Sequence, residues 1–229
     1  VEYAEWDLHD YRAMAQASPG LTESARQPFV YRILGPYITG LLPFSVDNSF
    51  LILTITFGLG LSLLFYFYLG STGFEPHISA IAAILFILNK YLFGFAAWNF
   101  FQLNDILSLI EIVLLMWAMT SEKWLLFGIV LFMGALTKET TLIMIPVAFI
   151  YLTDENSFDK KWRNVVAAVL PALLVAIGMR IVLHPEGGKS LYEAVLLYSD
   201  KLIVPETWFR LLINSFVPFS FLPIIFNDS

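Results

Sequence analysis

Long apolar runs alternate with short polar segments along this chain, a pattern typical of membrane-spanning helices. Residues 50–70 form an uncharged run of 21 residues, long enough for a hydrocarbon core of about 30 Å at about 1.5 Å per residue. The chain 124–151 is apolar except for Lys138 and Glu139 near its middle. One continuous helix would bury that pair at mid-membrane, so we expect two short helices that meet at residues 137–140. Further spans are expected over 78–99, 103–120, 164–183 (with Pro171 tolerated inside it) and 208–226. The pattern predicts an all-α, polytopic transmembrane bundle of seven spans, two of them short.

The first 49 residues are more polar and follow a different pattern. Asp7, Asp10 and Tyr11 recur at i, i+3 and i+4, so a helix places them on one face. Pro19 and its neighbours end that helix, and a second short helix is expected over 22–27. Between residues 30 and 41, apolar side chains recur with helical period, which predicts an amphipathic helix at the membrane interface. We therefore divide the chain into an N-terminal loop, 1–49, and a single membrane domain, 50–229.

Composition agrees with a membrane protein. Of 229 residues, 58% are hydrophobic and 14% are charged, with a mean hydropathy of +0.73, whereas soluble domains carry about 25% charged residues. The net charge of −6 argues against a nucleic-acid partner. Because residue 1 is Val and the last span ends close to residue 229, we expect a piece of a longer protein, truncated at both ends.

The distribution of basic residues predicts the orientation of the bundle. By parity, the short loops 71–77, 121–123 and 154–163 lie on the side opposite to loop 1–49. They hold Lys and Arg at higher density, although the longer loops hold the larger number. The positive-inside rule then places loop 1–49 on the non-cytoplasmic side of an inner, plasma or ER-like membrane.

The same topology gathers charged residues at one face of the membrane. Those on the side of loop 1–49 are Asp7, Asp10, Arg26, Arg32, Asp105, Lys138 and Glu139. Lys90 and Glu111 fall inside spans, where an ionisable group is costly and is more often functional. Two simpler explanations stay open: the charges can belong to solvated surfaces, and Lys90 can pair with Asp105 or Glu111 to hold helices together.

Four segments together resemble a known family. They are Asp-x-x-Asp-Tyr at 7–11, Pro-Phe-x-Tyr-Arg-Ile-Leu-x-Pro at 28–36, Asn-Asp at 104–105 and Gly-Ala-Leu-Thr-Lys-Glu at 134–139, before a helix with Pro146. In this order they resemble the GT-C superfamily of membrane glycosyltransferases, which includes protein mannosyltransferases and aminoarabinose transferases. The resemblance covers about residues 4–150. It implies sugar transfer from a polyprenyl-phosphate donor to an acceptor on the non-cytoplasmic face.

The resemblance also implies roles for single residues. Asp7 is expected as the general base, with Asp10 as the second choice, and Asp105 as the residue that orients the acceptor. The donor phosphate is expected to bind cations, for which Lys138, Arg32 and Lys90 are the candidates. Supporting roles are expected for Tyr11, Glu111 and Glu139. A divalent metal ion, if used, is expected at Asp7 and Asp105. The alternatives are a transporter or flippase for a lipid-linked or anionic solute, and a non-catalytic membrane scaffold.

Overall fold

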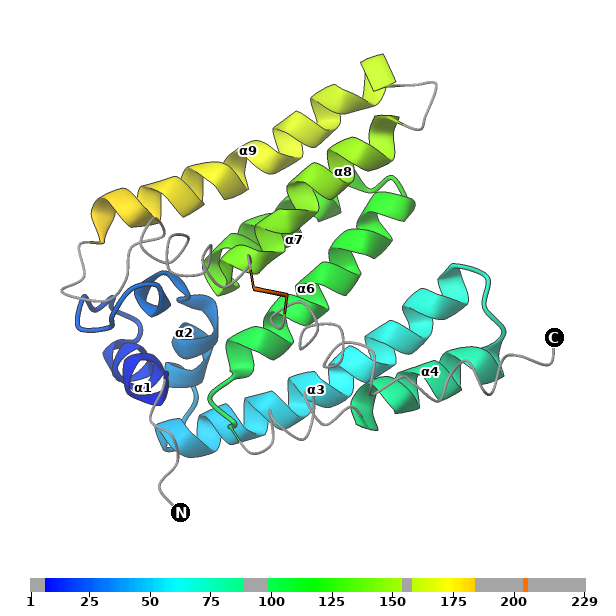
Figure 1. Ribbon diagram of the computed structural model, residues 1–229. Helices are drawn as coiled ribbons and strands as arrows, with labels where there is room; N and C mark the ends of the chain where they lie inside the picture. Colours follow the sequence, from blue (N-terminus) through cyan, green and yellow to red (C-terminus); the bar gives the residue numbers. More distant parts are fainter. Residues whose placement is uncertain (1–6, 89–98, 154–157, 184–203, 206–229) are drawn as a thin grey trace. The chain divides into compact units, whose positions relative to one another are not determined.

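The regular structure of the described residues is helical, with no strand among them. The computed structural model describes residues 7–88, 99–153, 158–183 and 204–205 (Figure 1). Three of its helices are long and apolar enough to cross a membrane: α3 (Val46–Ser71), α6 (Leu103–Thr120) and the stretch Lys161–Val182 of α9 (Phe158–Val182). The expected all-α class is confirmed for the described residues, and three helices have the length and apolar composition expected of membrane spans. The described residues up to 183 belong to one compact unit.

Shorter apolar helices complete the described part of the bundle. They are α4 (Pro76–Leu88), α7 (Trp124–Thr137), the 3-10 helix η3 (Glu139–Ile143) and α8 (Met144–Thr153). The expected interruption of 124–151 is confirmed, because Lys138 is extended (φ −165°, ψ 138°) between α7 and η3. Pro171 lies inside α9, as predicted. The predicted span 208–226, the end of 78–99 and Lys90 lie outside the described residues.

Close helix packing holds the centre of this unit together. Helix α7 packs against both α6 and α9, and α3 packs against α4 and α6 (Figure 1). At Gly128 of α7, an added Cβ would come within 3.0 Å of the Cα and carbonyl oxygen of Ala168 in α9. A larger residue would force these helices apart, so glycine sets their spacing. On the other flank, Phe65 of α3 stacks on Phe86 of α4 with ring centroids 4.7 Å apart.

The N-terminal segment folds onto one end of the bundle. It consists of α1 (Leu8–Ala17), the 3-10 helix η1 (Phe29–Tyr31) and α2 (Leu34–Gly40). Helix α1 ends before Ser18, as predicted, and packs closely on α2. An added Cβ on Gly40 would lie 2.1 Å from the carbonyl oxygen of Ala15. Two buried aromatic side chains, Tyr11 of α1 and Phe50 of α3, belong to the same apolar cluster.

Two sequence predictions for this segment are wrong. Residues 22–27 form no helix: the backbone N–H of Ser24 donates to Thr22 Oγ1 and that of Arg26 donates to the side chain of Asp10. Such side-chain acceptors compete with helical hydrogen bonds, and six residues are too few to resist them.

The single amphipathic helix expected over 30–41 is replaced by η1 and α2, with a break between them. A continuous helix would need the nitrogen of Pro36 to donate to the carbonyl of Arg32, and proline has no N–H. That carbonyl instead accepts a hydrogen bond from Asn104 Nδ2 at 3.2 Å. The apolar periodicity was real, but Pro36 prevents one helix from using it throughout.

Candidate functional site

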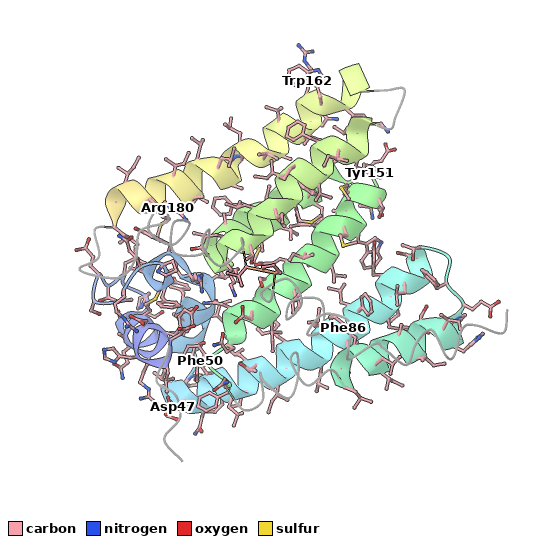
Figure 2. The ribbon with its side chains drawn as sticks, viewed as in Figure 1. Asp47, Phe50, Phe86, Tyr151, Trp162 and Arg180 are labelled. Atoms are coloured by element: carbon pink, nitrogen blue, oxygen red, sulfur yellow. The ribbon has the colours of Figure 1, made fainter. Side chains whose placement is uncertain are left out.

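Charged side chains from five elements meet where the N-terminal segment covers the bundle. The described contacts that close this end are Arg12 to Asp47, Gly35 to Asn104, Lys138 to Asp105 and Glu139 to Arg180. The first two contacts bind α1 and α2 to the starts of α3 and α6. The other two join the end of α7 to the start of α6, and η3 to the end of α9. In Figure 2, Asp47 and Arg180 both lie at the end of the bundle that faces α1 and α2.

Asp7 stands directly before α1 and is half-buried. Its carboxylate accepts no hydrogen bond from the described residues, not even as a cap of its own helix. Burial raises the pKa of this carboxyl above its ordinary value of 3.8, and the opposing attraction of Arg32 does not cancel the effect. Asp105 raises this pKa further, whereas Lys138 lowers it. Asp7 is therefore an unoccupied acceptor within electrostatic reach of the other predicted site residues.

Arg32 links three parts of the site. Its Nη1 donates to the hydroxyl of Tyr11 at 3.3 Å, and its Nε donates to Glu139 Oε2 at 3.1 Å. The guanidinium also lies over the ring of Phe29, 5.3 Å from the centroid. Burial raises the pKa of Tyr11 to about 12, so its hydroxyl stays protonated at neutral pH. Tyr11 can donate a hydrogen bond here but cannot act as a base.

Lys138 and Glu139 are neighbours in sequence but bind different partners. Lys138 Nζ pairs with Asp105 at the start of α6, whereas Glu139 pairs with Arg32 and lies 3.9 Å from Arg180 Nη2. Only 21% of the Lys138 side chain and 26% of the Glu139 side chain are exposed. Lys138 and Glu139 therefore do not form a turn exposed to solvent, which was one of the alternatives from the sequence. Lys138 pairs with Asp105 instead.

Asp10, predicted beside Asp7, has a different environment. Its side chain is fully buried. It accepts hydrogen bonds from the backbone N–H of Arg26 at 2.8 Å, and from Nε and Nη2 of the same residue at 3.2 and 2.8 Å. These contacts fasten the loop after α1 to that helix. The carboxylate that sequence ranked second as a base thus has its oxygens occupied.

Glu111 lies deeper in the bundle, on the buried side of α6. Thr137 Oγ1 donates to its Oε1 at 2.6 Å, while its Oε2 is buried with no hydrogen-bond partner in the described residues. Thr137 directly precedes Lys138. Glu111 therefore contacts the site only through the end of α7.

Two residues with clear positions in the site were not among the sequence-predicted ones. Arg180 of α9 stacks on the ring of Tyr31, 5.0 Å from the centroid, and approaches Glu139. Asn104 joins α6 to the N-terminal segment: its Oδ1 accepts from Gly35 N at 3.1 Å and its Nδ2 donates to the Arg32 carbonyl. The available signal for Arg180 was a lone cation at the end of an apolar span. For Asn104 it was an amide beside Asp105 in the quoted Asn-Asp pair.

The described residues contain no group of three or more His, Cys, Asp or Glu side chains with the geometry to hold a metal ion. Asp7 and Asp105 are brought near one another, but Lys138 already pairs with Asp105. No protein-family model, curated protein or solved structure matches this chain.

Proposed function

We propose that this chain is part of an integral membrane glycosyltransferase resembling the GT-C superfamily. It would transfer a sugar from a polyprenyl-phosphate donor to a hydroxyl acceptor at the non-cytoplasmic surface. The observation that carries the proposal is Asp7, a half-buried carboxylate with a raised pKa and no described hydrogen-bond partner. It lies within electrostatic reach of Arg32 and Lys138, at one end of a bundle of apolar helices. Free acceptor capacity beside fixed cations is what base-assisted displacement of a phosphate leaving group requires.

In this proposal Asp7 takes the proton of the acceptor hydroxyl. The acceptor oxygen then forms a bond to the anomeric carbon while the bond from that carbon to the phosphate oxygen breaks, with inversion. The electron pair leaves with the polyprenyl phosphate. A carboxylate whose pKa is raised by burial is a stronger proton acceptor than an ordinary aspartate.

The departing phosphate would be bound by Lys138 and Arg32, which already neutralise carboxylates in this structure. Lys138 supplies a point charge at the turn between α7 and η3, and Arg32 supplies a planar donor set. A phosphate that enters would compete with Asp105 for Lys138 and with Glu139 for Arg32. Asp105, once released from Lys138, would orient the acceptor. The predicted third cation, Lys90, lies outside the described residues.

The test is turnover of the protein in membranes, with a panel of polyprenyl-phosphate-linked hexoses and pentoses as donors and released polyprenyl phosphate as the readout. We expect Asp7→Asn to lower the rate by about 10²–10⁴-fold, the usual share of a general base. The matched control is Asp47→Asn, since Asp47 is a nearby aspartate bound only to Arg12 among the described residues. Turnover by Asp7→Asn equal to that of Asp47→Asn would remove Asp7 from the mechanism.

A transporter or flippase for an anionic solute is the second candidate, supported by one observation. Glu111 keeps a buried oxygen without a described partner beside the interrupted segment at Lys138. Buried acids next to broken helices are also common in transporters. Movement of a labelled lipid-linked sugar across proteoliposomes, without release of polyprenyl phosphate, would favour this candidate over the glycosyltransferase.

A further inference from the structure

A groove of about 620 Å³ lies between α7 and α9, far from the candidate site. It begins at Glu122 and Asn164, near the start of both helices, whereas Lys138 and Arg180 are near their other ends. Figure 2 shows the length of α9 that separates Trp162 from Arg180. The floor of the groove is formed by Gly128 and Ala168, where the two helices approach most closely.

The walls of the groove are apolar and open outward. Leu125 is 80% exposed and Ile129 is 53% exposed, and both line it. Helix α9 is long and apolar enough to cross a membrane, whereas α7 has 14 residues, about 21 Å of helix against a core of about 30 Å. In a bilayer these walls therefore face hydrocarbon, and a channel left beside a short helix suits a flexible apolar chain. Its volume lies within the roughly 300–1,000 Å³ usual for ligand pockets.

The mouth of the groove is polar, and two cations directly neighbour its lining residues in the sequence. Glu122 is bound by Lys161 at 2.7 Å. Lys123 and Arg163, the neighbours of the lining residues at the mouth, are exposed and form no ion pair within the described residues. Trp162, 39% exposed on α9, marks the same level, because tryptophan prefers the headgroup region of a membrane. An apolar groove that ends at two available cations matches a lipid with an anionic head.

We propose that this groove binds a membrane phospholipid, with one acyl chain between α7 and α9 and its phosphate at Lys123 and Arg163. The phosphate would accept charge-assisted hydrogen bonds from the two side chains. The acyl chain would cover the apolar walls and fill the space beside the short helix α7. This site is independent of the proposed glycosyltransferase activity, since it shares no residue with the charged end of the bundle.

The test is the amount of phospholipid that stays bound after purification in mild detergent, measured by native mass spectrometry. Ala167, an exposed residue that lines the groove, is replaced by Phe to fill it. Gly178→Phe is the control, because Gly178 lies on the same helix and a Cβ there meets open space. We expect Ala167→Phe to lose most of the bound phospholipid and Gly178→Phe to keep it.

A second experiment tests the headgroup contacts without changing the apolar walls. Dioleoyl phosphatidylglycerol and dioleoylglycerol are titrated onto delipidated protein. The two lipids carry the same two acyl chains, but only the first carries a phosphate headgroup. Replacing Lys123 and Arg163 together by Gln should lower the affinity for dioleoyl phosphatidylglycerol by roughly tenfold or more. The affinity for dioleoylglycerol should stay unchanged. Equal phospholipid retention by wild type and Ala167→Phe overturns the proposal. So does equal wild-type affinity for the two lipids. A cysteine at Ile129 that cross-links to a residue of 184–229 also overturns it, because the groove then holds the chain itself.

Discussion

Asn104 should be the residue on which the attachment of the N-terminal segment depends most. It is 3% exposed, and it serves two backbone groups that no other described residue serves. Its Oδ1 accepts from the N–H of Gly35 in the first turn of α2, a helix whose own N-terminal residue provides no side-chain cap. Asn104 therefore caps α2 from another helix and also binds the Arg32 carbonyl that Pro36 leaves free.

Replacing Asn104 by Leu keeps the side-chain volume nearly constant and removes both hydrogen bonds. Each buried backbone group left without a partner costs about 1–3 kcal/mol, and the added apolar burial offsets part of the sum. We expect a loss of about 2–4 kcal/mol in the free energy of unfolding, equivalent to roughly 4–16 °C in Tm for a chain of this size. Because the lost contacts join residues 32–35 to α6, amide exchange should rise mainly in 26–41.

The measurement is thermal unfolding in detergent, followed by hydrogen–deuterium exchange of the same variant. Asn48→Leu is the matched control, since Asn48 is an exposed asparagine at the start of α3 and its side chain makes no hydrogen bond to the described residues. If Asn104→Leu unfolds at the same temperature as Asn48→Leu, or if exchange rises equally along the chain, the capping argument is refuted.

Three further predictions follow from particular contacts. Gly35→Ala should lower the free energy of unfolding by about 1–3 kcal/mol, because its Cβ would come within 2.3 Å of Asn104 Oδ1. Gly60→Ala should raise the free energy of unfolding by about 0.5–1 kcal/mol, because a Cβ there meets nothing within 4 Å. Equal Tm values for the two variants would contradict this prediction. Since burial raises the pKa of Asp7, the folded state favours the protonated carboxyl, and that stabilisation is full below 3.8 and lost as the pH rises through the folded pKa. Asp7→Asn should therefore have a higher Tm than wild type at pH 7 and the same Tm below pH 3.8; a lower Tm at pH 7 would reverse the assigned sign. Lys138→Ala should weaken polyprenyl-phosphate binding by about 1.5–3 kcal/mol, with Lys138→Arg affected less, and unchanged affinity in both variants, measured in detergent, would exclude Lys138 as a phosphate ligand.

Hydrophobic periodicity was a good guide wherever the membrane-type helices decide the structure. Run length predicted α3 and α6, and the cost of a buried ion pair predicted the interruption at Lys138. The same method failed between residues 22 and 41, where single side chains decide the backbone. There, the side chain of Asp10 accepts a hydrogen bond from the backbone N–H of Arg26, and the side chain of Asn104 donates one to the carbonyl of Arg32.

The site was predicted as a set of residues but not as a set of partners. Sequence placed Arg32, Asp105, Lys138 and Glu139 on one side of the membrane, and the structure brings these residues together. The sequence alone did not predict that Lys138 binds Asp105 rather than Glu139, because the choice of partner depends on the extended backbone at Lys138. Arg180 was missed as a site residue for the same reason: it enters the site from a helix that begins 20 residues after the Lys138 turn.

The different fates of Asp7 and Asp10 decide how this helix is interpreted. The two carboxylates are three residues apart on one face, so spacing alone cannot rank them. Asp10 is enclosed by Arg26, and its removal would detach a loop. Asp7 binds no described partner, and its charge is disfavoured where it stands. Such a carboxylate lowers the stability of the folded state and makes no described contact, so the fold itself does not require it. Gain of stability together with loss of turnover in Asp7→Asn would therefore identify a working group, whereas loss of both would mean that Asp7, like Asp10, serves the fold.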